Sequence, residues 1–346
     1  MTVGLDLSDR YTQVCVMNAE GEIVEEGRVR TGPDAIGERF ARRPGMRIAL
    51  EAGAHSSWVS RLLESHGHEV YVADSRRLPL ISASVSKDDR RDAEMLARLV
   101  RSDPQLLSPI RHRPERVQAD RMTLQSRDAL VQARTALINR VRGLVKPFGV
   151  KIGRTSTRCF ATKAREQIPE QLGEAVAPLL RMIEELSQEI RKSDRLVEKI
   201  ARERYPVTEL LTQPNGVGTL TALAFAVTIV DPRRFPKSRA VGSYLGLRPR
   251  RSASGESDPQ LRITKAGDPW MRRLLVQSAQ YILGPFGKDS ALRRFGLARA
   301  ATGGKLAKKK AVVAVARKLA VLLHRLWVTG EAYEPLRAAR PESKPS

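Results

Sequence analysis

The chain has 346 residues, more than one hydrophobic core usually organises, so two or three domains are expected. Its content of 41% hydrophobic and 29% charged residues excludes a disordered chain. The formal net charge of +23 is typical of a protein that binds polyanions. From Arg233 to the end there are 25 Lys and Arg against 7 Asp and Glu, which concentrates +18 of the charge there. We therefore expect a nucleic-acid-binding face on the C-terminal third.

The cysteines and the apolar segments indicate a cytosolic protein. Cys15 and Cys159 are the only cysteines, and no cluster of Cys and His of the kind that binds zinc surrounds them. No signal peptide is expected, because charges such as Asp6 interrupt the apolar start. The longest apolar stretch, residues 220–230, is too short to cross a bilayer, so no membrane is expected as a partner.

The first hundred residues alternate strand and helix patterns. Strands are expected at residues 2–8, 11–18, 22–29, 47–53 and 69–75, and helices at residues 33–43, 56–67 and 87–101. Three strands followed by alternating helix and strand predict a mixed α/β sheet with helices on its faces. Such sheets bind ligands at strand ends, near the crossover points.

The middle of the chain is expected to form long helices, in a segment assigned to residues 111–205. Apolar residues recur at spacings of three and four at Leu130, Ala133, Leu137, Val141 and Leu144. A strict four–three repeat follows at Leu179, Ile183, Leu186, Ile190, Ser193, Val197 and Ile200. This heptad seam predicts a coiled-coil hairpin or a dimer contact. Packing within one domain and oligomerisation are equally favoured by the pattern.

The remainder, residues 206–336, is expected to be a mainly helical basic domain. Its last helix, at residues 308–327, carries one apolar face and several lysines. The tail at residues 337–346 is rich in Pro, Arg and Ser, which predicts disorder.

Four carboxylates in the first domain form the candidate metal site. Asp6 lies inside one apolar strand, and Glu51 ends another. Asp89 and Asp92 are three residues apart, so they share the inner edge of one helix. Each alone is explained as a cap or an arginine partner, but together bare carboxylates would repel one another. They predict one or two divalent cations with oxygen ligands, most plausibly Mg²⁺, as used for displacement at a phosphodiester.

A basic loop supplies the candidate nucleophile. Arg248, Arg250 and Arg251 precede Ser252 and Ser254. Guanidinium groups bind phosphate, and a serine among them attacks phosphorus when a base or a metal activates it. The alternative is a plain surface turn with solvated arginines.

Two neighbouring segments are candidates for DNA-backbone contacts. A turn at Gly216 and Gly218 precedes an expected helix, and backbone amides at such a turn bind phosphate oxygens. A tight turn between helices is the alternative. Lys265, Arg272 and Arg273 add charge to the same region.

The chain resembles the insertion-sequence family numbered one hundred and ten, the bridge-RNA-guided DEDD transposases. The resemblance rests on the order of the segments with Asp6, Glu51, Asp89 and Asp92, followed by the C-terminal motifs PNGVGTLTA, YLGLRPRRSASG and ITKAGDPWMRRLL. The resemblance implies a RuvC-like domain of the RNase H fold at residues 1–110, with the four carboxylates as ligands of Mg²⁺ or Mn²⁺. It also implies that the C-terminal transposase domain carries the nucleophilic serine, matched by Ser254. Asp88 adds a fifth carboxylate, and the spacing to Asp92 favours Asp89 as the ligand.

The resemblance further implies the partners. They are donor and target DNA, a structured noncoding bridge RNA that pairs with both, and further copies of the chain in a dimer or tetramer. The protein would then associate with the nucleoid of a prokaryotic cell. Because the serine and the carboxylates lie on different domains, the catalytic site is expected to be composite.

Three other functions remain open from the residues. A junction resolvase of the same fold needs the carboxylates but no serine. A sugar-kinase-like or actin-like ATPase has a similar start but gives no reason for the basic C-terminal third. A non-catalytic nucleic-acid-binding protein would use the acids as structural caps and would not need Mg²⁺.

Overall fold

A computed structural model describes residues 1–43, 45–74, 89–250 and 261–336 of the chain. The chain forms two compact units, Met1–Pro114 and Glu115–Ser346, which we describe one at a time and call the N-terminal and C-terminal units. Within the described ranges, no helix combines the length and the apolarity that a membrane span requires. The tail expected to be disordered, at residues 337–346, lies outside the described residues.

The N-terminal unit is built on one five-stranded mixed sheet in the order β3-β2-β1-β4-β5. The strands are β1 (Thr2–Leu7), β2 (Tyr11–Met17), β3 (Ile23–Arg30), β4 (Arg47–Glu51) and β5 (Glu69–Ala73). The first three pair antiparallel, whereas β1 with β4 and β4 with β5 pair parallel. All five expected strands are confirmed, and the mixed sheet is consistent with an RNase H-like domain.

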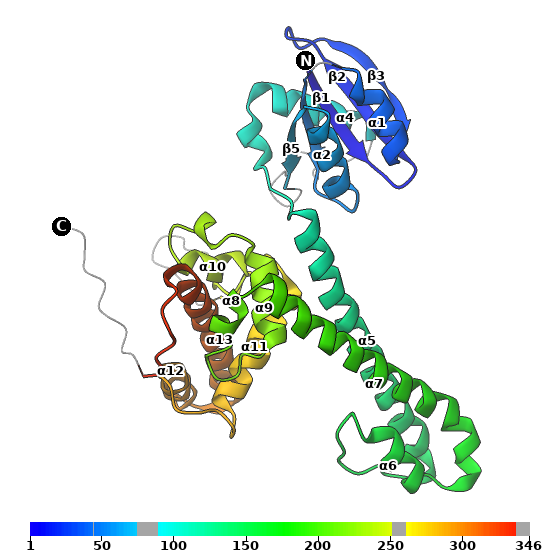
Figure 1. Cartoon of the computed structure of the whole chain (residues 1–346), viewed down its shortest axis with the longest axis vertical. Coiled ribbons are helices and arrows are strands. Elements are labelled where there is room, and N and C mark those ends of the chain that lie inside the picture. The colour runs from blue at the N-terminus through cyan, green and yellow to red at the C-terminus, as the bar shows by residue number, and fades with distance from the viewer. Residues whose placement is uncertain (44, 75–88, 251–260, 337–346) are drawn as a thin grey trace, which may run out of the picture. The chain divides into compact units, whose positions relative to one another are not determined.

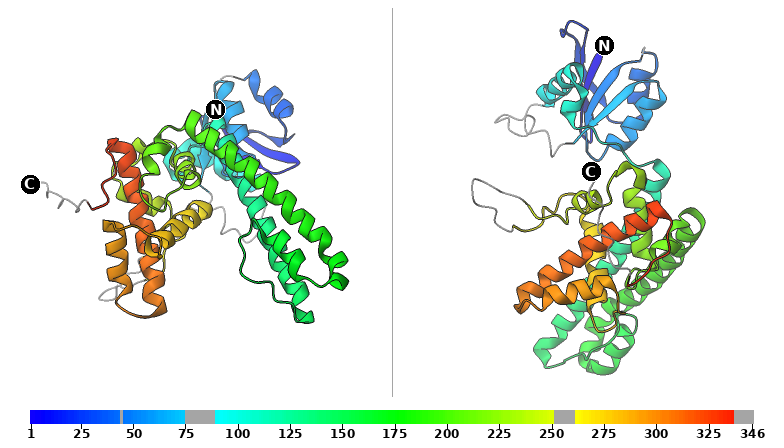
Figure 2. Two further views of the ribbon diagram at one scale, coloured as in Figure 1. Left: turned by 60° about the horizontal axis from the view of Figure 1, so that its bottom comes forward. Right: turned by 90° about the vertical axis from the view of Figure 1, so that its left-hand side faces the viewer.

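Helices cover both faces of this sheet, as Figure 2 shows in its right-hand view. On one face, α1 (Pro33–Ala41) and α2 (Ser56–Ser65) pack their buried residues onto the apolar side chains of β1, β2 and β4. On the other face lies α4 (Asp89–Ser102), whose residues Ala93 and Leu96 pack on the sheet. The expected helix is therefore confirmed from Asp89 onward, and its first two residues lie outside the described part of the chain.

The contact of α4 with the sheet is unusually close at Gly4. A Cβ atom on Gly4 would lie 1.8 Å from the carbonyl oxygen of Ala93 and 2.6 Å from the backbone nitrogen of Ala97. These are backbone atoms, which cannot rotate away as a side chain does. The helix therefore rests directly on β1, and only glycine is compatible with this distance.

The C-terminal unit is helical, apart from short 3-10 turns and one isolated bridge in its described part. Its helices are α5 (Glu115–Val145), α6 (Phe160–Gln167), α7 (Glu170–Arg204), α8 (Val207–Leu211), α9 (Thr219–Ile229), α10 (Arg239–Tyr244), α11 (Pro269–Leu283), α12 (Ala291–Ala300) and α13 (Gly304–Thr329). Figure 1 shows α5 and α7 side by side, with α6 at the far end of the pair. The expected last helix is confirmed with slightly wider bounds.

The long helices α5 and α7 run antiparallel within one chain. Asp120 near the start of α5 accepts hydrogen bonds from Arg204 and Tyr205 at the end of α7, and Arg127 pairs with Asp194 at 2.7 Å. These contacts hold the α8 end of the pair. The division of this unit at residue 205 and the coiled coil stay predictions, since the long helices share a core with the C-terminal helices.

The heptad seam is only partly the buried face. On α7, Ile183, Ile190, Val197 and Ile200 are buried, as the seam predicts. On α5, Ala133 and Leu144 are exposed in this chain and do not contribute to its own helix packing. The core on that side is formed by Ile138, Val141 and Val145 at the α6 end, where α5, α6 and α7 enclose a separate apolar cluster. Arg127 and Arg134 replace apolar packing in the middle of the pair.

We predict that Gly4→Ala destabilises the N-terminal unit by about 1–3 kcal/mol or more, because the added methyl group forces α4 away from β1. Hydrogen exchange of β1 and β2 peptides in increasing denaturant measures this loss. Gly53→Ala is the matched control, because a Cβ atom there meets nothing within 4 Å. Equal protection of the β1 and β2 amides in Gly4→Ala and Gly53→Ala would contradict the close approach of α4 to β1.

Candidate functional site

Two of the four candidate carboxylates lie at adjacent strand ends. Asp6 is the second-last residue of β1, and Glu51 is the last residue of β4. Leu5 pairs with Leu50 in the parallel register, so Asp6 and Glu51 occupy the next position on each strand. Gly4 and its partner Ala49 face α4. Because side chains alternate along a strand, Asp6 and Glu51 face α4 as well.

The other two carboxylates belong to the first turn of α4. The far end of α4 lies near the start of β1, because the Arg101 guanidinium lies beside Gly21 in the turn after β2. The helix thus runs back along β1, and its first turn lies towards the strand ends with Asp6 and Glu51. Asp92 is half-buried there, and Asp89 is exposed.

The donor types fit a hard divalent cation, because all four groups offer carboxylate oxygens. In the described ranges, however, no group of three or more His, Cys, Asp or Glu side chains is arranged to hold a metal ion. The backbone brings the four residues to one edge of the sheet, but their side chains do not form a ligand cluster. The predicted metal site stays a prediction.

A pair that we did not anticipate from the sequence lies at the same sheet edge. His55, which follows β4, contacts Asp9, which follows β1, with Nε2 3.0 Å from Oδ1. The other ring nitrogen of His55 accepts a hydrogen bond from Trp58 Nε1 at 3.1 Å. The pair links the loops after the two carboxylate-bearing strands. Strand pairing brings it together, and no local spacing in the sequence reveals it.

In the C-terminal unit, a paired stem leads to the segment with the candidate serine. The amide of Arg250 donates to Arg262 at 2.9 Å, that of Thr264 to Arg248 at 2.9 Å, and that of Lys265 to Gly246 at 3.1 Å. We call residues 246–250 with 261–265 the stem. Arg251, Ser252 and Ser254 lie outside the described residues. Arg250 and Arg262, on either side of this segment in the sequence, are neighbours in the stem.

Four of the candidate DNA-binding cations lie on or beside this stem. Arg248, Arg250 and Lys265 are exposed. Arg272 on α11 has a different environment, because its Nη1 donates to the carbonyl oxygens of Leu245 at 3.2 Å, Ala266 at 2.8 Å and Gly267 at 3.1 Å. Burial lowers the pKa of its guanidinium. In the structure Arg272 joins α11 to the residues on either side of the stem.

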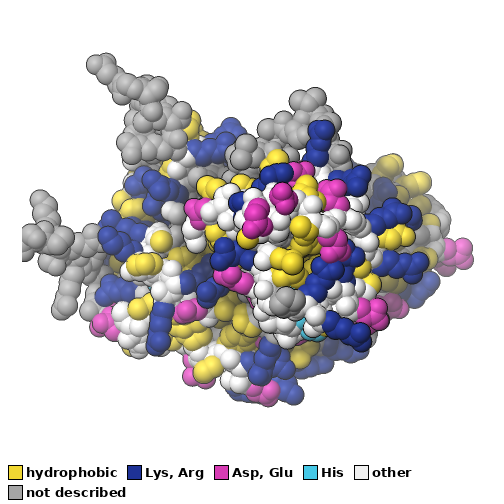
Figure 3. Space-filling model, turned by 90° about the horizontal axis from the view of Figure 1, so that it is seen from above, with side chains coloured by type: hydrophobic (Ala, Val, Ile, Leu, Met, Phe, Trp, Pro, Cys, Tyr) yellow, Lys and Arg dark blue, Asp and Glu magenta, His cyan; other side chains and the backbone are white. Residues whose placement is uncertain are grey.

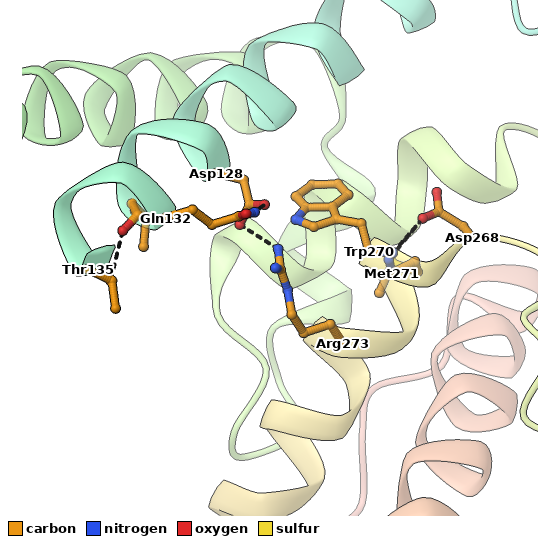
Figure 4. Close-up of polar contacts among 8 residues, drawn as sticks. Asp128, Gln132, Thr135, Asp268, Trp270, Met271 and Arg273 are labelled. Carbon is orange, nitrogen blue, oxygen red and sulfur yellow. Dashed lines mark hydrogen bonds and ion pairs between the residues drawn. The ribbon is translucent and has the colours of Figure 1, made fainter. Parts of the chain in front are cut away.

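Ion pairs join the start of α11 to α5. Asp268 caps α11 through the amides of Trp270 and Met271, and it also pairs with Arg121 at 2.5 Å. Burial alone would raise the pKa of Asp268, but the hydrogen bond and charge of Arg121 hold it below its usual value. Figure 4 shows Arg273 reaching from α11 to Asp128 on α5, at 2.5 Å.

The turn at Gly216 and Gly218 is packed against another helix. Gly216 has a positive φ of 90°, and a Cβ atom there would lie 3.1 Å from atoms of Ser278, Tyr281 and Ile282 on α11. Gly218 is exposed and is the N-cap of α9. The turn therefore has a packing role, and its role in DNA binding stays a prediction.

Charge is distributed unevenly in sequence but is mixed on at least one face. Figure 3 shows lysine and arginine side chains interleaved with Asp and Glu and with hydrophobic patches on the face that it draws. The excess of positive charge is therefore not one uninterrupted field over that face. Local geometry is needed to assign a binding surface.

We predict that Arg272→Ala accelerates hydrogen exchange in the stem, because three carbonyl oxygens lose their donor. A loss of about 1–3 kcal/mol corresponds to roughly five- to 150-fold in exchange rate. Arg294→Ala is the matched control, since the pair of Arg294 with Asp289 is exposed. Unchanged exchange combined with weaker DNA binding would show that Arg272 is a phosphate contact instead.

Comparison with known proteins identifies the domains that carry these features. A DEDD transposase model of the IS110 family, described as a transposase, matches residues 3–148. A second model, described as the transposase IS116/IS110/IS902 family, matches residues 208–295. The first match contains all four candidate carboxylates, and the second contains the stem and the segment with Ser254.

Curated relatives agree along most of the chain. A probable family 20 transposase of Pseudomonas aeruginosa is 28% identical over 81% of this chain and 83% of its own length. A putative transposase of Sinorhizobium fredii is 28% identical over 96% of this chain and 85% of its own length. The transposase for insertion sequence element IS1111A of Coxiella burnetii is 25% identical over 81% of this chain and 77% of its own length. The chain belongs to the IS110 family of transposases, enzymes that cleave and recombine DNA.

Proposed function

We propose that this transposase cleaves and exchanges DNA strands with Ser254 as nucleophile, with Asp6, Glu51, Asp89 and Asp92 holding Mg²⁺, and with a noncoding bridge RNA as guide. The observation that carries the proposal is the meeting of two strand ends and the first turn of α4 at one sheet edge. A DEDD transposase domain implies the use of a divalent metal. Mn²⁺ would serve the same carboxylate ligands.

Four carboxylates that share one sheet edge favour a bound divalent cation, because a cation offsets the repulsion between like charges. When bound, Mg²⁺ would neutralise charge on the phosphodiester that is displaced. Asp6 and Glu51 supply ligands from the rigid sheet, and Asp92 and Asp89 supply them from the helix.

Ser254 would perform the strand cleavage. Its Oγ attacks phosphorus, an Oγ–P bond forms, and the P–O bond to one side of the strand breaks, with the serine proton passing to the leaving oxygen. The strand is then held as a phosphoserine ester, which conserves the bond energy for rejoining. The exposed guanidinium groups of Arg248 and Arg250 at the base of the segment support the proposal, because they suit the binding of DNA phosphates.

The RNA guide and the assembly complete the proposal. Pairing of a bridge RNA with donor and target DNA would supply the sequence specificity, and the basic protein would bind duplex backbones. Strand exchange needs two DNA partners, so we propose a dimer or tetramer of the chain. RNA that co-purifies with the protein and maps to the flank of its gene would support the guide.

The serine chemistry has a direct test in a suicide DNA substrate. We predict that wild-type protein forms a covalent protein–DNA adduct in Mg²⁺, which denaturing gels detect, and that Ser254→Ala forms none. Ser252→Ala is the matched control and should retain the adduct. Cleavage that persists undiminished in Ser254→Ala would instead favour a junction resolvase, which hydrolyses DNA with its metal site alone.

A further inference from the structure

A groove with apolar walls and a basic rim lies on the C-terminal unit. Its volume is about 1000 Å³, and it is formed by α12, α13, the stem and residues 331–335. We propose that this groove binds an unpaired DNA strand beside the cleaved phosphodiester. The inference rests on the proposed function, because it extends the DNA-processing region around the stem.

The floor of the groove is made of aliphatic side chains that are only half-buried. Val313, Val321 and Leu322 on α13 line it. Apolar surface of this extent is normally covered, so an open apolar groove marks a binding site. Its walls are fixed, since the amide of Ala291 donates to Pro335 at 2.7 Å and that of Tyr333 to Gln213 at 2.6 Å.

The rim of the groove is strongly positive. Nine of the lining residues are Lys or Arg, and two are Glu. Lys309, Lys310, Arg317 and Lys318 on α13 belong to this rim, and Arg325, which pairs with Glu331 at 3.4 Å, lies about two turns further along the helix. A row of cations along a groove is complementary to a linear polyanion.

One of these cations is held in place by an aromatic ring in the lining of the groove. The Lys318 ammonium lies 3.9 Å from the centroid of the Phe295 ring, and the Arg299 guanidinium lies 5.4 Å from it. Cation–π contacts of this kind restrict the long side chains before a ligand arrives. The rim is therefore partly pre-organised over the apolar floor.

An unpaired strand fits both properties better than a duplex. Duplex DNA presents phosphates and hides its bases, which would leave the aliphatic floor exposed to water. A single strand presents phosphates to the rim and base faces to the floor. The stem forms one wall of the groove, through Leu247, Pro249, Ile263 and Lys265. A strand in the groove would therefore run beside the stem, which precedes and follows the segment with Ser254 in the sequence.

The test measures binding of fluorescent oligothymidine to the full-length protein across a range of salt. We expect Lys309→Gln with Lys318→Gln to weaken binding by roughly tenfold and to reduce the slope of log K against log salt by about 1.4, or 0.7 for each lost phosphate contact. The matched control is Lys192→Gln with Lys199→Gln on α7, which changes the same charge on exposed lysines of the same unit.

A third variant tests the apolar floor. Val321→Ser removes apolar surface without changing charge. It should therefore weaken the binding of oligothymidine severalfold at high salt and leave the binding of duplex DNA unchanged. Thermal unfolding checks that each variant is folded. The proposal would be overturned if the double substitution in the groove and the double substitution on α7 weakened oligothymidine binding equally. It would also be overturned if Val321→Ser weakened the binding of duplex and of single-stranded DNA equally. Tighter binding of an acidic apolar peptide than of oligothymidine would also overturn it.

The groove and the serine chemistry can fail separately. Ser254→Ala should bind oligothymidine as tightly as the wild type does, even though it forms no covalent adduct. If the covalent adduct forms in Ser254→Ala but the groove variants still bind oligothymidine more weakly, the assignment of the nucleophile is wrong and the assignment of the groove is supported. If the groove variants bind normally while Ser254→Ala loses the adduct, the groove assignment is wrong alone.

Discussion

The close approach of α4 to β1 at Gly4 determines the geometry of the N-terminal unit. Because a side chain at that position would meet backbone atoms of Ala93 and Ala97, the helix lies directly against the middle of the sheet. Its first turn is then directed to the edge where β1 and β4 end in parallel. Two aspartates from the helix and two acids from the strands share that edge as a result. The sheet order makes this possible, since β1 and β4 are neighbours although a hairpin and a helix separate them in sequence.

The sequence was sufficient for the local elements of this unit. Alternation and apolar runs located all five strands, and the three-residue spacing of Asp89 and Asp92 located one helical face. The pairing of His55 with Asp9 was not predictable, because it depends on which strands become neighbours. Side-chain positions within the acidic group were not predictable either, since they depend on charge balance and on what is bound. The sequence indicates that four carboxylates belong together, and the fold explains their shared edge.

In the C-terminal unit, the type of a residue predicts its contacts less well than its surroundings in the fold do. Arg272 and Arg273 were expected at a DNA surface, and in the structure Arg272 binds carbonyl oxygens next to the stem and Arg273 pairs with Asp128 on α5, while their role in DNA binding stays a prediction. An arginine serves carbonyl oxygens, carboxylates and phosphates equally well, so composition does not separate these roles. The apolar repeat on α5 is buried only in part within this chain, and arginines interrupt the core there. The apolar groove was not visible in the sequence, because helices, the stem and the chain end far apart in sequence create it together.

The convergence of the acidic residues on a divalent cation is the central claim, and crystals soaked in Mn²⁺ test it most directly through anomalous scattering. The account predicts an anomalous peak at the ends of β1 and β4, within coordination distance of carboxylate oxygens of Asp6, Glu51 and Asp92. Replacement of Asp92 by Asn should weaken or abolish that peak, whereas Glu94→Gln, two residues further along α4 on another face of the helix, should leave it. A peak elsewhere in the N-terminal unit, or none at this edge in fully soaked crystals, would contradict the account.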